Sequence, residues 1–264
     1  MSLAVSPPTR GDDVIDPEQA LPLTGERTVP GITEENYWFR RHEAAYEWAA
    51  PLAAGRRVLE VGCGEGYGTA MLAGAAAAVL GVDYDAAAIA HAGRRYPQAR
   101  FVRANLAALP APSGSCDLVV TLQVIEHVWN HPEFVGECRR VLGPDGRLLV
   151  TTPNRLTFSP GQDTPLNPFH TVEFTGAELV ALLRAGGFDI DLLAGLHAGP
   201  RLAGLDARHG GSFVGAQISR PPGEWPAVLH TDVSSVTTAD FEIVADGERP
   251  VDASLDLVVL ARPA

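Results

Sequence analysis

The feature that most constrains the fold is an apolar run that ends abruptly in a glycine-rich loop. The run covers residues 58–61, and in the loop that follows, residues 62–66, every second residue is glycine. Glycine permits positive φ and close backbone approach, so a ligand can lie against bare peptide groups. A helix expected through residues 69–73 would point its N–H groups at that ligand. This order predicts the first unit of a doubly wound nucleotide-binding sheet.

The spacing of the glycines favours a ligand other than a dinucleotide. The dinucleotide fingerprint has glycine at its first, third and sixth positions, but the sixth position counted from Gly62 is Tyr67. An acidic residue, Glu60, precedes the turn, which favours a ligand with an ammonium group and no pyrophosphate. A second apolar run, residues 79–82, ends in Asp83, about 20 residues beyond the loop, where a carboxylate can bind both ribose hydroxyls.

A third segment completes a nucleoside site. Asn105 and Leu106 precede another apolar run, residues 117–120, at a place where an adenine edge can be read. Together these segments resemble the S-adenosylmethionine (SAM) site of class I methyltransferases. The resemblance implies an α/β fold, a Rossmann-like doubly wound seven-stranded sheet with an antiparallel edge strand. The alternative is a plain tight turn after the first strand, with Asp83 merely capping a helix near Ala86.

Composition fits a single intracellular domain. The 264 residues suffice for one large α/β domain, and the net charge of −12 disfavours nucleic acid and anionic membranes as partners. Cys63, Cys116 and Cys138 show no metal-ligand spacing, which indicates reduced core thiols in a cytoplasmic protein. No signal peptide or membrane-inserting span is expected. The oligomeric state stays open.

The predicted organisation is a disordered lead-in, residues 1–22, followed by one methyltransferase domain, residues 23–264. Within that domain, residues 34–50 show a helical pattern with an aromatic and basic cluster. We expect this helix to be a lid over the cofactor, with Arg41 pairing the methionyl carboxylate. The alternative is a helix that packs and snorkels against the domain. The predicted cofactor-binding residues are Tyr37, Arg41, Glu60, Gly62, Cys63, Gly64, Asp83, Tyr84, Asn105, Leu106 and Gln123.

The later elements end in a long insertion. Strands are expected at residues 188–193 and 255–260, the latter as the antiparallel edge strand, and residues 196–254 lie between them. An ordinary connection has about 4–6 residues, so this segment is predicted to bind the acceptor. Its polar side chains suit carbohydrate and are expected to form one wall of an open groove. The alternative is a surface excursion without a site. The predicted acceptor-binding residues are Arg201, Asp206, Arg208 and His209.

Candidate catalytic groups follow the fourth and fifth strands. Transfer of a methyl group to a hydroxyl is an in-line displacement, so the protein mainly aligns oxygen, carbon and sulfur. An alcohol also needs a base, and His127 and His170 are the predicted candidates. Glu126 is expected to orient an imidazole or a bound cation. The alternatives are that Glu126 and His127 simply begin a helix and that His170 only pins its loop.

Four runs are similar to a narrower family, the actinobacterial sugar O-methyltransferases that build the methylglucose lipopolysaccharide of mycobacteria. They are residues 23–28, 35–42, 152–161 and 206–211. The resemblance implies methylation of the 6-hydroxyl of glucose units in a cytosolic α-glucan precursor, hence an oligosaccharide or polysaccharide partner. Neither composition nor spacing indicates that regiochemistry.

Other activities remain as alternatives. Residues 123–127, with His170 and Glu173, are also similar to RNA 2′-O-methyltransferases, which hold a metal on two glutamates and two histidines. Here the first glutamate position is Gln123, a poorer ligand for a hard cation, although Mg²⁺ held by Glu126, His127 and His170 stays an option. A phenol or quinone O-methyltransferase would have an apolar acceptor pocket. A non-catalytic SAM-binding module would need no base.

Overall fold

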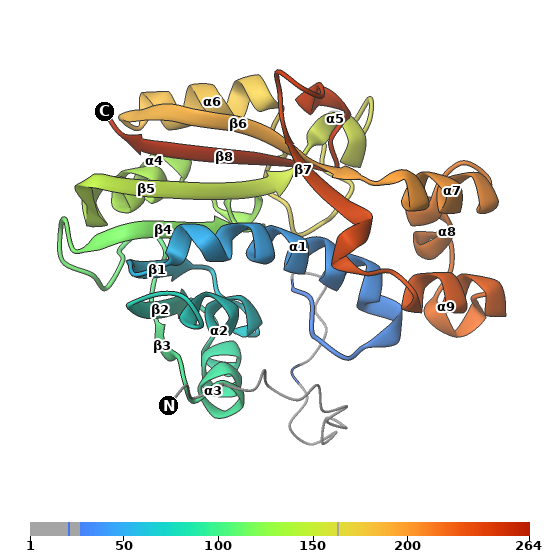
Figure 1. The fold of residues 1–264 in the computed structure, drawn as a ribbon, viewed down its shortest axis with the longest axis horizontal. Helices are drawn as coiled ribbons and strands as arrows, with labels where there is room; N and C mark the ends of the chain where they lie inside the picture. Colours follow the sequence, from blue (N-terminus) through green and yellow to red (C-terminus); the bar gives the residue numbers. More distant parts are fainter. Residues whose placement is uncertain (1–20, 22–26, 163) are drawn as a thin grey trace, which may run out of the picture.

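The structure, a computed structural model, describes residue 21, residues 27–162 and residues 164–264. The predicted lead-in, residues 1–22, therefore lies outside the described residues except for Leu21, which is buried. The described chain folds around one sheet with the strand order β3-β2-β1-β4-β5-β8-β6-β7, covered by helices on both faces (Figure 1). The strands are β1 (Arg57–Val61), β2 (Ala78–Asp83), β3 (Arg100–Arg103), β4 (Cys116–Leu122), β5 (Leu142–Pro153), β6 (Phe188–Ala198), β7 (Phe241–Ala245) and β8 (Asp256–Pro263).

The α-helices divide between the two faces. Buried residues of α4 and α6 pack with one side of the sheet, and those of α1, α2, α7, α8 and α9 pack with the other. In Figure 1, α7, α8 and α9 form a group at one end of the sheet. The helices are α1 (Asn36–Ala53), α2 (Tyr67–Ala73), α3 (Ala86–Arg95), α4 (His131–Val141), α5 (Arg155–Phe158), α6 (Gly176–Ala185), α7 (Pro200–Arg208), α8 (Phe213–Ile218) and α9 (Ala227–Ser234).

The doubly wound α/β fold is confirmed, but the predicted count of seven strands is wrong. Strands β1 to β5 pair in parallel, whereas β8 runs antiparallel to both β5 and β6. The final strand is thus antiparallel as expected but lies inside the sheet. The edge strand on that side of the sheet is β7, which pairs antiparallel with β6, and β3 is the edge on the other side. With five residues and a short apolar alternation, β7 gives too weak a periodic signal to be predicted.

Local sequence signals are visible in the structure at the start of α6 and in the core. Thr175 accepts a hydrogen bond from the Glu178 N–H, and the Glu178 carboxylate accepts one from the Thr175 N–H, so α6 begins with a capping box. Cys63, Cys116 and Cys138 are all buried and free, which confirms the prediction of core thiols.

Helix α1 is present, but the two side chains predicted to reach the cofactor lie in other contacts. Tyr37 is buried and makes edge-to-face contacts with Phe213 and Phe241, each with 5.7 Å between ring centroids. Arg41 is 3% exposed and directs its guanidinium at Asp256, the first residue of β8, with an Nε–Oδ2 distance of 2.7 Å. The roles predicted for Tyr37 and Arg41 at the cofactor are therefore wrong. The buried carboxylate of Asp256 needs a cation, and Arg41 supplies it.

The Arg41–Asp256 pair is expected to dominate the docking of α1. Arg41→Ala leaves Asp256 buried without its cation, which should lower the free energy of unfolding by about 3–5 kcal/mol. The matched control is Arg40→Ala, which removes a side chain that is 38% exposed and pairs with Glu43. This surface pair is worth less than about 1 kcal/mol. Equal losses in the two variants, measured by urea denaturation, would contradict the assignment.

Candidate active site

The loop after β1 requires glycine at two positions. Gly62 has φ of +84°, and a Cβ there would lie 2.4 Å from Cγ2 of Val124. Gly66 has φ of +99°, and its Cβ would lie 2.6 Å from the Cβ of Ala92. Side chains at these positions would clash with the core and strain the backbone. The backbone of this loop is therefore left bare at the carboxyl end of β1.

A cavity of about 650 Å³ opens at the carboxyl ends of β1, β2 and β4. This is the place where doubly wound sheets bind their ligands. Its walls include most of the residues predicted to bind the cofactor, together with one of the predicted bases. These are Gly62, Cys63, Gly64, Asp83, Tyr84, Asn105, Leu106, Gln123 and His127.

Asp83 lies in the cavity wall and does not cap helix α3. Its Oδ2 accepts a hydrogen bond of 2.8 Å from the Gly64 N–H, and its Oδ1 accepts one of 2.9 Å from the Asp85 N–H. Helix α3 is capped by Asp85, which accepts a bond from the Ala87 N–H. Because each carboxylate oxygen has two lone-pair sites, both Asp83 oxygens retain capacity for a pair of hydroxyl groups.

Gln123 marks the end of β4 with an unusual backbone. Its φ is +58°, the only positive value among the described residues other than glycine. The backbone is fixed there because the Gln123 N–H donates to the Thr151 carbonyl at 2.9 Å, and Nε2 of the side chain donates to the Thr151 hydroxyl. Such left-handed residues persist only where their surroundings hold them, and they concentrate at functional sites.

Glu60 lies below the glycine loop and not in the cavity. Its Oε1 accepts a hydrogen bond of 2.5 Å from the Tyr46 hydroxyl, and its Oε2 accepts one from the Thr69 hydroxyl. Burial raises the pKa of this carboxyl to about 7. The prediction that Glu60 contacts the ligand is wrong, because its oxygens join α1 and α2 to β1.

Several cavity residues were missed by the sequence analysis. Thr28 places its hydroxyl 3.0 Å from the Tyr67 hydroxyl and 3.3 Å from Nδ1 of His42. Burial lowers the pKa of His42 to about 4, so this imidazole is neutral. His42 follows Arg41 directly, but successive side chains of a helix point about 100° apart around its axis, so the two residues face different surroundings. The missed lining residues include Arg27, Thr28, His42, Tyr46 and Tyr67.

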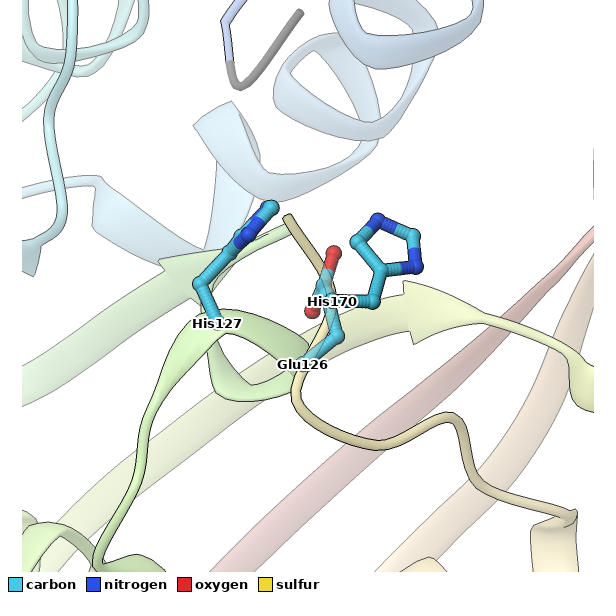
Figure 2. A group of neighbouring side chains, drawn as sticks. All are labelled: Glu126, His127 and His170. Carbon is cyan, nitrogen blue, oxygen red and sulfur yellow. The ribbon is translucent and has the colours of Figure 1, made fainter. Parts of the chain in front are cut away.

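The three predicted catalytic side chains do come together. Figure 2 shows the Glu126 carboxyl between the imidazoles of His127 and His170, and ligand atoms from all three lie within 4.8 Å of one another. The two imidazoles meet edge to face, with 4.9 Å between ring centroids. Glu126 and His127 belong to a 3₁₀ turn after β4, Ile125–His127, whereas His170 lies on the loop that leads to α6.

The hydrogen bonds distinguish the two histidines. Nδ1 of His127 lies 3.0 Å from the Phe169 carbonyl oxygen, which can only accept, so Nδ1 carries the proton and Nε2 keeps a lone pair. His170 has partners on both nitrogens, Glu173 at Nδ1 and the Asn167 amide at Nε2. Of the two, His127 alone lines the cavity. The open lone pair therefore belongs to His127, and His170 is held behind it.

Glu126 is a buried acid. It is 1% exposed, its Oε2 accepts a hydrogen bond of 2.8 Å from the Thr152 hydroxyl, and burial raises its pKa to about 8. At neutral pH its carboxyl is therefore largely protonated. A divalent ion on Glu126, His127 and His170 would have to displace that proton. The second oxygen of Glu173 is buried and has no hydrogen-bond partner among the described residues.

Thr171 joins the two loops of the cluster. Its N–H donates to the Glu126 carbonyl at 2.7 Å, and its hydroxyl donates to the Val128 carbonyl at 2.7 Å. These bonds fix the turn after β4 against the loop that carries His170. The relative position of the two imidazoles is set by this pairing.

The predicted acceptor residues stabilise the insertion itself. Arg201 pairs with Asp240 at 2.7 Å, and Asp232 binds both Arg208 and His209. Asp206 accepts a hydrogen bond from the N–H of Phe213, at the start of α8. None of Arg201, Asp206, Arg208 and His209 lines the cavity. His209 instead borders a second hollow of about 440 Å³ within the insertion, so the open acceptor groove expected there stays a prediction.

The pKa of Glu126 gives a stability prediction. Between its ordinary value of 4.5 and about 8, the native protein holds a proton that the unfolded chain releases. The contribution of Glu126 to stability therefore falls as pH rises through this window. We expect the melting temperature to fall more steeply between about pH 6 and about pH 8 in the wild type than in Glu126→Gln, whose amide cannot ionise. Parallel curves would contradict the buried, protonated state.

Within the described part of the chain, no helix has both the length and the apolar character needed to cross a bilayer.

Comparisons with known proteins agree with this geometry. Residues 59–150 match the sequence model of the family described as a methyltransferase domain. A probable S-adenosylmethionine-dependent methyltransferase of Mycolicibacterium smegmatis is 55% identical over 244 residues, which cover 92% of this chain and 95% of that protein. A similarly named protein of Mycobacterium tuberculosis is 53% identical over 260 residues, covering 96% and 95% of the two chains.

The fold also matches a solved structure. A SAM-dependent methyltransferase from Thermotoga maritima, described as a possible histamine N-methyltransferase, superimposes with a TM-score of 0.57. The match covers 87% of this chain and 94% of that one at 19% identity, so it bears on the fold alone. The two mycobacterial relatives match over nearly the whole chain at more than half identity. This chain therefore belongs to the S-adenosylmethionine-dependent methyltransferases.

Proposed function

We propose that this methyltransferase transfers the methyl group of SAM to a sugar hydroxyl, with His127 as the general base. The observation that carries the proposal is the open Nε2 of His127 in the wall of the cavity, with Nδ1 held by the Phe169 carbonyl. As the hydroxyl oxygen bonds to the methyl carbon, the carbon–sulfur bond breaks and sulfur leaves as a neutral thioether. The hydroxyl proton passes to Nε2 of His127.

Each part of SAM is assigned to a different group of residues in the cavity wall. The ribose hydroxyls bind Asp83, and the adenine lies by Asn105 and Leu106, which line the same cavity. The methionine part lies along the bare backbone of the glycine loop, beside Thr28. This arrangement directs the methyl group toward the turn that carries His127.

The proposal also specifies which hydroxyl of the acceptor is methylated. The resemblance to the sugar O-methyltransferases of methylglucose lipopolysaccharide points to the 6-hydroxyl of glucose units in a cytosolic α-glucan precursor. The test is mass spectrometry of a panel of gluco-oligosaccharides, manno-oligosaccharides, phenols and short RNAs incubated with SAM. A mass gain of one methyl group on gluco-oligosaccharides is expected. Methylation of the phenols or RNAs alone would contradict the proposal.

The same cluster offers a second candidate chemistry. Glu126, His127 and His170 present one carboxylate and two imidazoles at ligand distance from one another. Imidazole suits borderline cations such as Zn²⁺ or Ni²⁺, whereas Mg²⁺ takes oxygen ligands, so the site fits Mg²⁺ poorly. Held there, a divalent cation would polarise the acceptor hydroxyl. Binding would also require ionised Glu126, so metal affinity would increase as pH rises toward about 8.

Asp83 is expected to control cofactor affinity. Asp83→Ala removes charge-assisted hydrogen bonds to the ribose and should weaken SAM binding by about 2–4 kcal/mol in calorimetry. The control is Asp117→Ala, which removes a partly exposed carboxylate paired with Arg57 at the other end of the sheet. Circular dichroism checks that both variants fold. If a folded Asp83→Ala protein bound SAM like the wild type, the ribose assignment would fail.

His127 is expected to control turnover and not binding. His127→Ala should keep SAM and acceptor affinity but slow methyl transfer by about 10²–10⁴-fold. The control, His230→Ala, removes an imidazole of the insertion that lies outside the cavity and should keep the wild-type rate.

A chelator separates the two chemistries. With His127 as base, EDTA leaves the rate unchanged. Loss of activity in EDTA, restored by a divalent cation, would make the cluster a metal centre. Near wild-type turnover in His127→Ala would overturn both roles.

A further inference from the structure

An exposed tryptophan stands beside the candidate base. Trp129 is 89% exposed, more than any other large apolar side chain among the described residues, although it lines the cavity. Phe169, 43% exposed, lines the same cavity from the facing loop. Burying an indole is worth several kcal/mol, so a tryptophan left open at a cavity mouth indicates a surface that binds something.

Hydrogen bonds anchor the backbone beside each of the two aromatic residues. Trp129 lies two residues after it, and the adjacent Asn130 caps α4 by accepting a hydrogen bond from the Glu133 N–H. Phe169 is tied directly, because its carbonyl accepts the proton of His127 Nδ1. Its own N–H donates to the side chain of Asn167 at 3.0 Å. Both aromatic residues therefore come from loops anchored next to His127, and both line the cavity that His127 lines.

The lining of this end of the cavity selects a neutral partner. Besides His127, the two loops contribute Val128, Trp129, Asn130, Pro168, Phe169 and Thr171, none of which carries a charge. Among the described residues, Arg27 is the only arginine or lysine in the cavity wall, and it is paired with Asp85. A phosphorylated or carboxylated acceptor would find no free cation among the described lining residues. A polar, uncharged acceptor with an apolar face fits instead.

We propose that Trp129 and Phe169 form an aromatic platform on which pyranose rings of the acceptor stack. One face of a pyranose consists of C–H groups, which pack on the π face of an aromatic ring, while its hydroxyls reach polar neighbours such as Asn130. The near-complete exposure of Trp129 suits a glycan that continues beyond the cavity. This inference rests on the proposed function and moves acceptor binding from the insertion to the mouth of the cavity.

Fluorescence and calorimetry test the platform directly. Of the four tryptophans, Trp38, Trp48 and Trp225 are half-buried or buried, so Trp129 is the one most open to solvent. Titration with an α-(1→4)-gluco-oligosaccharide in the presence of S-adenosylhomocysteine should shift the wild-type emission to shorter wavelength. Trp129→Ala should abolish this shift, weaken glycan binding and raise the acceptor KM by about 10-fold or more, with SAM affinity and kcat at saturation unchanged. Trp129→Phe should recover most of the affinity.

Controls separate this inference from the proposed function. Ile218→Ala removes a 68% exposed apolar side chain of α8 and should bind glycan like the wild type. If the wild type methylates the oligosaccharide but Trp129→Ala keeps its KM, the platform is wrong and the function stands. If the wild type neither binds nor methylates any glycan, the proposed function fails. Binding of a phenol at Trp129, without glycan binding, would overturn the carbohydrate assignment.

Discussion

The hydrogen bonds of Thr171 are the constraint on which the candidate chemistry depends. Its N–H and hydroxyl hold the turn after β4 against a loop more than 40 positions further along the chain, through the carbonyls of Glu126 and Val128. His127 and His170 meet because those loops meet. Trp129 and Phe169 belong to the same two loops and line the same cavity. A general base must lie within hydrogen-bond reach of the proton that it removes. The Thr171 hydrogen bonds therefore set the geometry of methyl transfer.

Burial determines the charge state of the acidic side chains around the two loops. Glu126 stays largely protonated at neutral pH because it is desolvated, so it adds little negative charge beside the imidazoles. Arg41 satisfies the buried carboxylate of Asp256 and so docks α1 on β8. With α1 in place, Tyr37 packs between Phe213 of the insertion and Phe241 of β7. The insertion is thus part of the scaffold.

The sequence predicted those features that local patterns encode. Glycine spacing and a strand-end carboxylate located the cofactor cavity around Gly62 and Asp83, and histidines after adjacent strands located the cluster. The errors came from side-chain direction and long-range pairing. Arg41 and His42 are neighbours in sequence, yet Arg41 faces Asp256 and His42 faces the cavity. Arg208 looked free to bind a sugar because its partner, Asp232, lies 24 residues away in another helix.

The central claim is that one cavity aligns SAM, an acceptor hydroxyl and His127. A crystal structure with S-adenosylhomocysteine and an α-gluco-oligosaccharide tests it most directly. The account predicts ribose hydroxyls on the Asp83 carboxylate, a pyranose stacked on Trp129, and one sugar hydroxyl between the cofactor sulfur and Nε2 of His127. A glycan bound on the insertion, with no hydroxyl within hydrogen-bonding distance of His127, would contradict it.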